Sequence, residues 1–161
     1  MEISQDFSDM MIYPLIEYTN STEETESFGS KIAELIANDP SLPKFIALYG
    51  DLGVGKTAFV RGFASKITPA ARVKSPTFAL VNEYRGDPLS VFHFDMYRIT
   101  DEDELYSIGF FDYLDRRGIA LVEWSENIEY ALPCEYFSLT IEKCLDESTE
   151  KRKITLNLIK N

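Results

Sequence analysis

The sequence has little cysteine and little positive charge. Cysteine occurs only at Cys134 and Cys144, too few for a disulfide framework and without the spacing of a metal site. Acidic residues number 27 against 16 basic ones, so the net charge is −11. A chain that grips nucleic acid by itself needs a basic surface, so direct contact of this kind is disfavoured. A nucleic-acid pathway in which another subunit makes the contacts stays open.

Long apolar runs are also missing. No run approaches the roughly 18–20 residues of a membrane span, and the first eleven residues lack the basic and apolar regions of a signal peptide. We therefore expect a cytoplasmic protein with reduced thiols, and a Cys134–Cys144 disulfide is the minor alternative. With 161 residues, the chain predicts one domain at 12–161, preceded by a flexible, polar and acidic tail at 1–11.

The segment GDLGVGKT at residues 50–57 fits the phosphate-binding loop pattern G-x-x-x-x-G-K-[ST] at every required position. Glycines let the backbone curl so that successive N–H groups point into one anion-binding concavity at the start of a helix. Lys56 is expected to reach the β- and γ-phosphates, and the Thr57 hydroxyl to ligate Mg²⁺. The predicted nucleotide-binding residues of this loop are Gly50, Asp51, Leu52, Gly53, Val54, Gly55, Lys56, Thr57 and the following Ala58.

The flanking residues supply the context that this motif requires. Residues 45–49, FIALY, form the continuous apolar run of a buried parallel strand. Residues 56–67 place apolar side chains at spacings of three and four, as one face of a helix does. A strand, a glycine loop and a helix therefore follow one another in the order expected of a nucleotide-binding protein.

The remaining periodicities predict the rest of an α/β fold. Pro14 limits the strand at 12–18 to a sheet edge, Ser21 and Glu24 form a capping box, and Thr100 caps a short acidic helix. Further strands are expected at 78–84 and 90–97, joined as an antiparallel hairpin, at 119–124, and at the alternating C-terminal segments; a further helical piece is expected at 110–116. The expected fold class is a three-layer α/β P-loop NTPase with a mainly parallel central sheet plus antiparallel hairpin strands.

Two carboxylates are candidates for the second half of the site. Glu123 directly follows the apolar run 119–122, where phosphate-loop proteins place the carboxylate that orients Mg²⁺, more often an aspartate. Strand alternation places a polar row of His93, Asp95 and Tyr97 on one face, and Asp95 is a candidate metal-shell ligand or water-positioning base. The alternatives are a surface role for Glu123 and a structural role for His93, the single histidine.

Between the loop helix and the hairpin lies the segment KSPTF at residues 74–78. Pro76 stiffens this segment, and Ser75 and Thr77 offer hydroxyl groups. In nucleotide switches such a segment senses the γ-phosphate and Mg²⁺. A capped turn without that function is the alternative.

Taken together, GDLGVGKT, SPTFALVNEY, HFDMYR and LVEW, in this order and in a chain of this size, resemble the bacterial TsaE (YjeE) family. The resemblance runs from about Thr22 to the C-terminus. The phosphate loop alone is shared with many families, whereas the other three motifs are far more particular. Val54 and Ala58 differ from the residues expected at their positions, but neither is a proposed ligand side chain.

The resemblance implies an ATPase of tRNA threonylcarbamoyladenosine biosynthesis that acts with TsaD-type and TsaB-type partners and meets tRNA only through that complex. ATP and Mg²⁺ are the implied cofactors. Carried over by position, Lys56 and Thr57 bind phosphate and metal, Glu123 completes the metal site, and Thr77 and Asp95 lie in switch-like motifs. Thr22 and Thr25 open a helix near the adenine in this family. Trp124 is either near the nucleotide or a partner, or in the core.

Two other functions compete with this one. A small-molecule kinase on the same fold needs a basic lid, but residues 100–115 are acidic. The second is a nucleotide-gated binding module, for which hydrolysis is incidental. The residues alone do not distinguish such a module from an ATPase whose hydrolysis is required. Without an arginine finger, hydrolysis by the isolated chain is expected to be slow; Arg98 or a partner's arginine are the candidates for that role.

Overall fold

The computed structural model describes residues 12–161. The tail predicted at 1–11 lies outside the described residues. Within this range the strands form one seven-stranded sheet in the order β1-β7-β6-β2-β5-β4-β3. The strands are β1 (Leu15–Thr19), β2 (Phe45–Tyr49), β3 (Val81–Tyr84), β4 (Ser90–Asp95), β5 (Gly118–Glu123), β6 (Glu135–Lys143) and β7 (Arg152–Lys160).

The centre of the sheet is parallel and its edges are antiparallel. β2 pairs in parallel with β5 and β6, and β4 pairs in parallel with β5. β3 joins β4 as the expected antiparallel hairpin, and β7 pairs antiparallel with both β6 and the edge strand β1. The described part of the chain thus has the expected fold class, with a mixed sheet whose antiparallel pairings come from the hairpin and the C-terminal strands.

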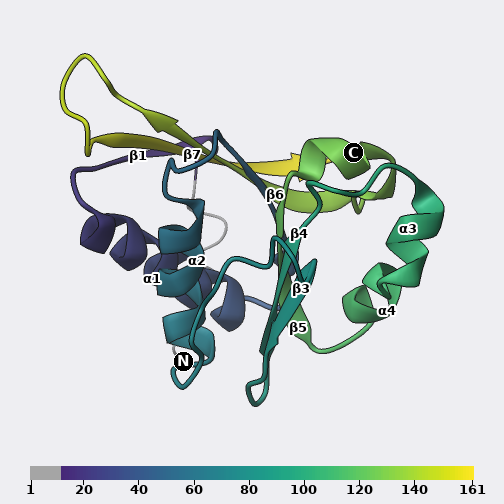
Figure 1. The fold of residues 1–161 in the computed structure, drawn as a ribbon. Coiled ribbons are helices and arrows are strands. Elements are labelled where there is room, and N and C mark those ends of the chain that lie inside the picture. Colours follow the sequence, from purple (N-terminus) through teal and green to yellow (C-terminus); the bar gives the residue numbers. More distant parts are fainter. Residues whose placement is uncertain (1–11) are drawn as a thin grey trace, which may run out of the picture.

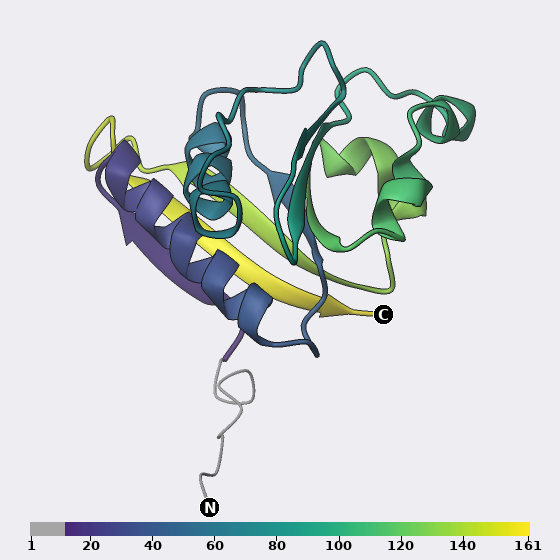
Figure 2. The ribbon, with the colours of Figure 1, turned by 90° about the horizontal axis from the view of Figure 1, so that it is seen from below.

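Helices cover both faces of the sheet, which makes three layers (Figure 1; Figure 2). α1 (Thr22–Asn38) and α2 (Lys56–Ile67) lie on one face, over an apolar core that includes Ile46, Leu48 and Phe137. The other face packs Phe45, Phe94 and Phe110 into a second core. It is covered by α3 (Glu102–Ser107), α4 (Phe110–Leu114) and the 3₁₀ segment η2 (Ser125–Ala131). No helix within residues 12–161 is both long and apolar enough to cross a membrane.

Glycines let α1 and α2 approach closely. A Cβ added at Gly62 on α2 would lie 1.8 Å from the Glu26 carbonyl oxygen on α1, and one at Gly29 on α1 would lie 2.3 Å from the Phe59 carbonyl oxygen. The two backbones therefore meet where neither helix carries a side chain. This contact fixes the position of α2, and with it the position of the loop that precedes α2.

Most expected elements are confirmed, with differences at their ends. Ser21 is the N-cap of α1 and accepts from the Glu24 amide at 3.1 Å, but the Glu24 carboxylate reaches back to the Asn20 amide, one residue earlier than in a standard capping box. The predicted Thr100 cap is wrong. Asp101 caps α3, and Thr100 instead donates from its amide to the Glu104 carboxylate.

The first hairpin strand is shorter than predicted. It was expected over residues 78–84 but begins at Val81, because the Leu80 amide donates to the Pro76 carbonyl oxygen at 2.7 Å and closes a turn. Leu80 has φ +68° in this turn, a value that ends regular extended structure. The next strand likewise ends at Asp95 rather than at residue 97. Both differences leave polar loop residues at the same end of the sheet.

Candidate functional site

The loop at residues 50–57 connects the carboxyl end of β2 to the first turn of α2. Gly50, Gly53 and Gly55 have φ values of +135°, +78° and +118°, which side chains with a Cβ rarely adopt. A Cβ at Gly50 would also lie 2.6 Å from the Ile141 carbonyl oxygen. Gly55 is the N-cap of α2 and provides no side-chain cap. The N–H groups of the first helical turn are therefore left to bind an anion.

A cavity of about 230 Å³ opens beside this loop at the carboxyl ends of the parallel strands. Such ends are where open α/β sheets bind their ligands. The residues that line the cavity come from the loop, α2, the segment before β3, and the ends of β4 and β5: Leu52, Gly53, Gly55, Lys56, Thr57, Ser75, Thr77, Asp95, Glu123 and Trp124. Most of the predicted catalytic and phosphate-binding residues thus meet in one place.

The Lys56 side chain is held at this cavity by two contacts. It is only 7% exposed, its ammonium donates to the Gly50 carbonyl oxygen, and Nζ lies 5.4 Å from the centre of the Trp124 ring. A cation over an indole face is attracted by the ring quadrupole. Trp124 has φ +57°, so the chain turns sharply after β5 and places the indole beside the lysine.

Asp95 and Glu123 lie side by side at the ends of β4 and β5, where they are register partners. Both are 5% exposed. Asp95 accepts from the Tyr97 amide at 2.9 Å and from the Thr77 hydroxyl at 3.2 Å. The Thr77 hydroxyl is also 2.8 Å from that of Ser75. The segment before β3 is therefore joined directly to a carboxylate of the site.

His93 does not line the cavity but contacts a residue that does. Its ring is fully buried, and its Nε2 lies 3.0 Å from the Glu123 carboxylate. Tyr97, expected on the same strand face, lies beyond the end of β4, is 58% exposed and packs against Trp124 with ring centres 5.0 Å apart. The polar row expected along β4 therefore ends at Asp95.

A second cavity of about 200 Å³ lies on the other side of the phosphate loop. Its lining includes Thr22, Thr25 and Ala58, and it shares Gly53 and Gly55 with the first cavity. The Thr25 hydroxyl is buried and lies 2.7 Å from the Thr19 hydroxyl. The residues expected near an adenine are thus separated from the lysine and carboxylates by the loop itself.

Arg152 is a further residue of the site and lies outside every motif of the sequence. It lines the second cavity and donates from Nε to the Val54 carbonyl oxygen at 2.7 Å. The contact joins β7 to a loop 98 residues earlier, so no local pattern indicates it. Ser75 and Trp124, which line the first cavity, had local signals in the motifs SPTF and LVEW.

Some predicted residues lie away from both cavities. Asp51 is exposed and lines neither cavity. Val54, by contrast, lines the second cavity, although most of its side chain is buried in the core. Arg98 is exposed and lies over the Phe78 ring, 5.1 Å from its centre. It is not among the residues that line the first cavity.

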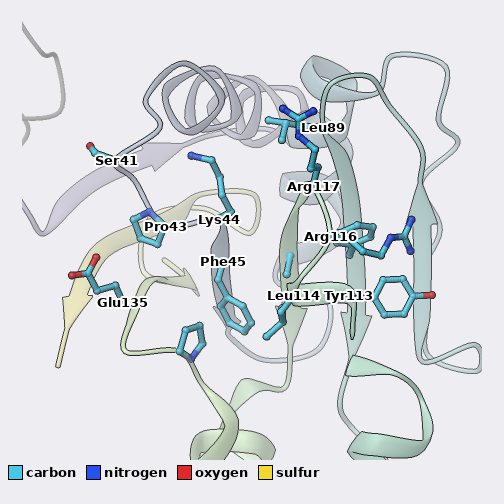
Figure 3. A pocket seen from close by; sticks show the side chains of 14 residues that line it. Ser41, Pro43, Lys44, Phe45, Leu89, Tyr113, Leu114, Arg116, Arg117 and Glu135 are labelled. Atoms are coloured by element: carbon cyan, nitrogen blue, oxygen red, sulfur yellow. The ribbon is translucent and has the colours of Figure 1, made fainter. Parts of the chain in front are cut away.

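A further hollow, of about 450 Å³, lies at the opposite, amino ends of the parallel strands (Figure 3). Phe45 lies between a wall formed by Pro43 and Lys44 and another that includes Arg116. The Lys44 ammonium donates to three backbone carbonyls at 2.9, 2.9 and 3.0 Å, and burial lowers its pKa. Arg116 pairs with Glu83. These two cations are therefore engaged in holding the fold together.

The donor set of the first cavity suits a hard cation. It brings together the Thr57 hydroxyl and the carboxylates of Asp95 and Glu123, and Mg²⁺ prefers oxygen ligands, often one or two carboxylates. Among residues 12–161, no cluster of three or more histidine, cysteine or acidic side chains is placed to hold a metal by itself. These residues fit a cation that is shared with bound phosphate oxygens.

Comparison with known proteins gives a consistent result. Residues 19–154 match the model of a family described as threonylcarbamoyl adenosine biosynthesis protein TsaE. The chain is similar to the tRNA threonylcarbamoyladenosine biosynthesis protein TsaE of Bacillus subtilis (strain 168), with 37% identity over 143 residues, 89% of this chain and 85% of that protein. It is also similar to the Haemophilus influenzae protein of the same name, with 43% identity over 108 residues, 66% of this chain and 68% of that one.

A solved structure supports the same assignment. The fold is similar to the crystal structure of Bacillus subtilis YdiB, with a TM-score of 0.70 and 31% identity, covering 92% of this chain and 88% of that chain. The family match covers the phosphate loop, Thr77, Asp95 and Glu123. The resemblance seen in the sequence is therefore confirmed, and the chain belongs to the TsaE family of threonylcarbamoyl adenosine biosynthesis proteins.

Proposed function

We propose that this chain is the ATPase subunit of tRNA threonylcarbamoyladenosine biosynthesis, binding and hydrolysing ATP with Mg²⁺ in a complex with TsaD-type and TsaB-type proteins. One observation carries the ATPase assignment: Lys56, Thr57, Asp95 and Glu123 line one cavity beside the phosphate loop. Family membership supports the pathway. The net charge of −11 supports contact with tRNA through the partners, because a protein that grips RNA alone needs a basic surface.

Each part of the site has a distinct task in this proposal. The curled backbone of the loop and the first turn of α2 bind the phosphates through N–H groups. Lys56 offsets negative charge on the transferred phosphoryl group. Asp95 and Glu123 orient the attacking water or the metal's water shell, and Mg²⁺, when bound, neutralises charge on the phosphate oxygens. The second cavity, beside Thr22 and Thr25, receives the nucleoside.

The absence of arginine from the lining of the first cavity, within the described residues 12–161, bears on the rate. An arginine that stabilises the transition-state charge contributes about 10³–10⁵ in rate to related enzymes. We expect slow hydrolysis by the isolated chain and faster hydrolysis when a partner supplies a cation. The same observation keeps a second candidate in view, a nucleotide-gated module whose hydrolysis is incidental.

The nucleotide site is tested by Lys56→Ala, with Lys66→Ala as the matched control. Lys66 lies on the same helix α2, and its ammonium is 3.5 Å from Glu34 in a half-exposed pair, a kind that contributes little to stability. We expect Lys56→Ala to stay folded and to lose ATP hydrolysis with and without the partner proteins, while Lys66→Ala keeps both rates. Equal rates for the two variants would refute the site.

The gated-module candidate is tested by Glu123→Ala in a reconstituted reaction with both partners, ATP and tRNA. If repeated tRNA modification requires ATP hydrolysis, Glu123→Ala binds ATP but supports at most one modification per complex. Many modifications per complex, without hydrolysis, would favour the gated module.

A further inference from the structure

His93 occupies a place where a polar side chain is costly. The ring is fully buried, and its Nδ1 has no hydrogen-bond partner among the described residues. Tyr84 lies beside it, with ring centres 6.5 Å apart, but the Tyr84 hydroxyl is engaged with the Lys74 backbone. An apolar side chain would fill this space without leaving a buried nitrogen unpaired. The reason for a histidine at this position must therefore lie in the contact that its other ring nitrogen makes.

That nitrogen, Nε2, lies 3.0 Å from Oε2 of Glu123. A carboxylate accepts hydrogen bonds, so Nε2 carries the proton and donates it. The partner is diagonal: on β5, the register partner of His93 is Leu121, and that of Asp95 is Glu123. Residues two apart on a strand share a face, so all four lie on the same face of the sheet, and the histidine reaches along β5 toward the cavity.

The contact restricts Glu123. Its other carboxylate oxygen makes no hydrogen bond within residues 12–161, and the residue lines the cavity beside Thr57 and Asp95. A glutamate has three rotatable side-chain bonds, and fixing one oxygen leaves the other in a defined direction. Ligands of metals and of their water shells are commonly oriented by such outer hydrogen bonds.

We infer that His93 is a positioning residue that holds the Glu123 carboxylate in the orientation needed to bind Mg²⁺ or its water shell. This inference rests on the proposed nucleotide site. It assigns to the histidine no contact with nucleotide and no proton transfer, only the hydrogen bond from Nε2. Loss of that bond should therefore weaken the response to Mg²⁺ and leave the binding of nucleotide by the loop intact.

Two substitutions separate the hydrogen bond from the polarity of the ring. The amide nitrogen of His93→Gln can stand near the position of Nε2 and donate to Glu123, whereas the shorter His93→Asn reaches only as far as Nδ1. Both bury one amide in place of the ring. Trp124 is the single tryptophan and lies beside Lys56, so its fluorescence reports on the cavity without a label.

The experiment titrates Mg²⁺ into the full chain saturated with ADP and follows Trp124 fluorescence. We expect His93→Asn to need at least about ten-fold more Mg²⁺ than wild type, the lower end of the range for outer hydrogen bonds to metal ligands. His93→Gln should stay near wild type, and ADP affinity without Mg²⁺ should be unchanged in both. Equal behaviour of the two variants, or a matching loss of metal-free ADP affinity in His93→Asn, would overturn the role.

A failure of the proposed nucleotide site and a failure of the role of His93 give different results in this titration. A wild-type chain that never responds to Mg²⁺ and ADP contradicts the nucleotide site and with it the role of His93. A normal wild-type response that His93→Asn retains contradicts only the role of His93.

A second measurement does not depend on the folding of the His93 variants. Because the chain has one histidine, its imidazole N–H proton can be followed by NMR without ambiguity. We expect this signal to shift when Glu123 is replaced by alanine in a chain that remains folded. An unchanged Nε2–H signal would overturn the inference.

Discussion

The Thr77 hydroxyl donates to the Asp95 carboxylate across 3.2 Å and so joins the segment before β3 to the end of β4. Asp95 is also fixed by the Tyr97 amide at 2.9 Å. The Asp95 carboxylate is thus held both by the backbone just after β4 and by the segment before β3. That segment contributes Ser75 and Thr77 to the cavity lining. A change at Thr77 should therefore reach the chemistry through Asp95.

Thr77→Val removes the hydroxyl and nearly preserves the shape of the side chain. We expect hydrolysis in the presence of the partners to fall about ten-fold, the effect of losing roughly 1.5 kcal/mol for a hydrogen bond to a charged group. ATP affinity should change little, because the phosphate loop is untouched. Single-turnover hydrolysis and equilibrium nucleotide binding measure the two effects. Thr77→Ser keeps the hydroxyl and is the control; equal slowing in both variants would contradict the role of this bond.

Arg152 allows a test of how β7 supports the phosphate loop. Its Nε donates to the Val54 carbonyl oxygen at 2.7 Å, so Arg152→Met should loosen the loop and weaken nucleotide binding about ten-fold. Calorimetric titration with ADP measures the change. Lys153→Met removes the same charge from the next residue of β7, whose side chain lies on the opposite face. If both variants lose affinity equally, charge rather than the bond to the loop is responsible.

Gly62 should not tolerate a side chain. Alanine is the better helix former by about 1 kcal/mol, but here its Cβ would lie 1.8 Å from the Glu26 carbonyl oxygen. We expect Gly62→Ala to lower the free energy of unfolding by roughly 2–3 kcal/mol, as overpacking of a close contact does. Denaturant unfolding measures this, with Lys66→Ala as an exposed control on the same helix. A variant as stable as wild type would show that α1 and α2 can separate freely.

The ion pair between Glu83 and Arg116 should make stability depend on pH. The hydrogen bond from Arg116 lowers the pKa of Glu83 below its usual value of 4.5. A carboxyl group whose pKa is lower in the folded state than in the unfolded state stabilises the protein at pH values above its unfolded-state pKa. This contribution is lost as the pH falls through the folded-state pKa. Glu83→Gln should therefore melt at a lower temperature than wild type at neutral pH.

At pH well below 4.5 the two melting curves should converge, since the wild-type carboxyl is then protonated in both states. Thermal unfolding followed by circular dichroism over this range measures the difference. A gap of constant size at all pH values would mean that packing around residue 83, and not its charge, is responsible.

Local signals in the sequence were sufficient for the phosphate loop and the elements on either side of it. The three glycines of the loop need backbone angles that other residues avoid, and the runs 45–49 and 56–67 carry the periods of a buried strand and a helix face. Glu123 was recognisable because a carboxylate after an apolar strand falls at the edge where phosphate loops lie. Local signals did not fix the ends of the elements: Asp101 rather than Thr100 caps α3, since neighbouring oxygen-bearing side chains compete for the same N–H groups.

What the sequence determined by itself is therefore local: which segments are strands and helices, which loop has the phosphate-binding pattern, and which acidic residues follow a buried strand. Only the tertiary structure decided that Nε2 of His93 holds Glu123, that Arg152 supports the loop from β7, and that Trp124 lies over Lys56. These contacts depend on strand order, on register and on a sharp turn after β5. The physical reason is that spacing along the chain fixes backbone geometry, whereas contacts across a sheet arise only when distant segments pack together.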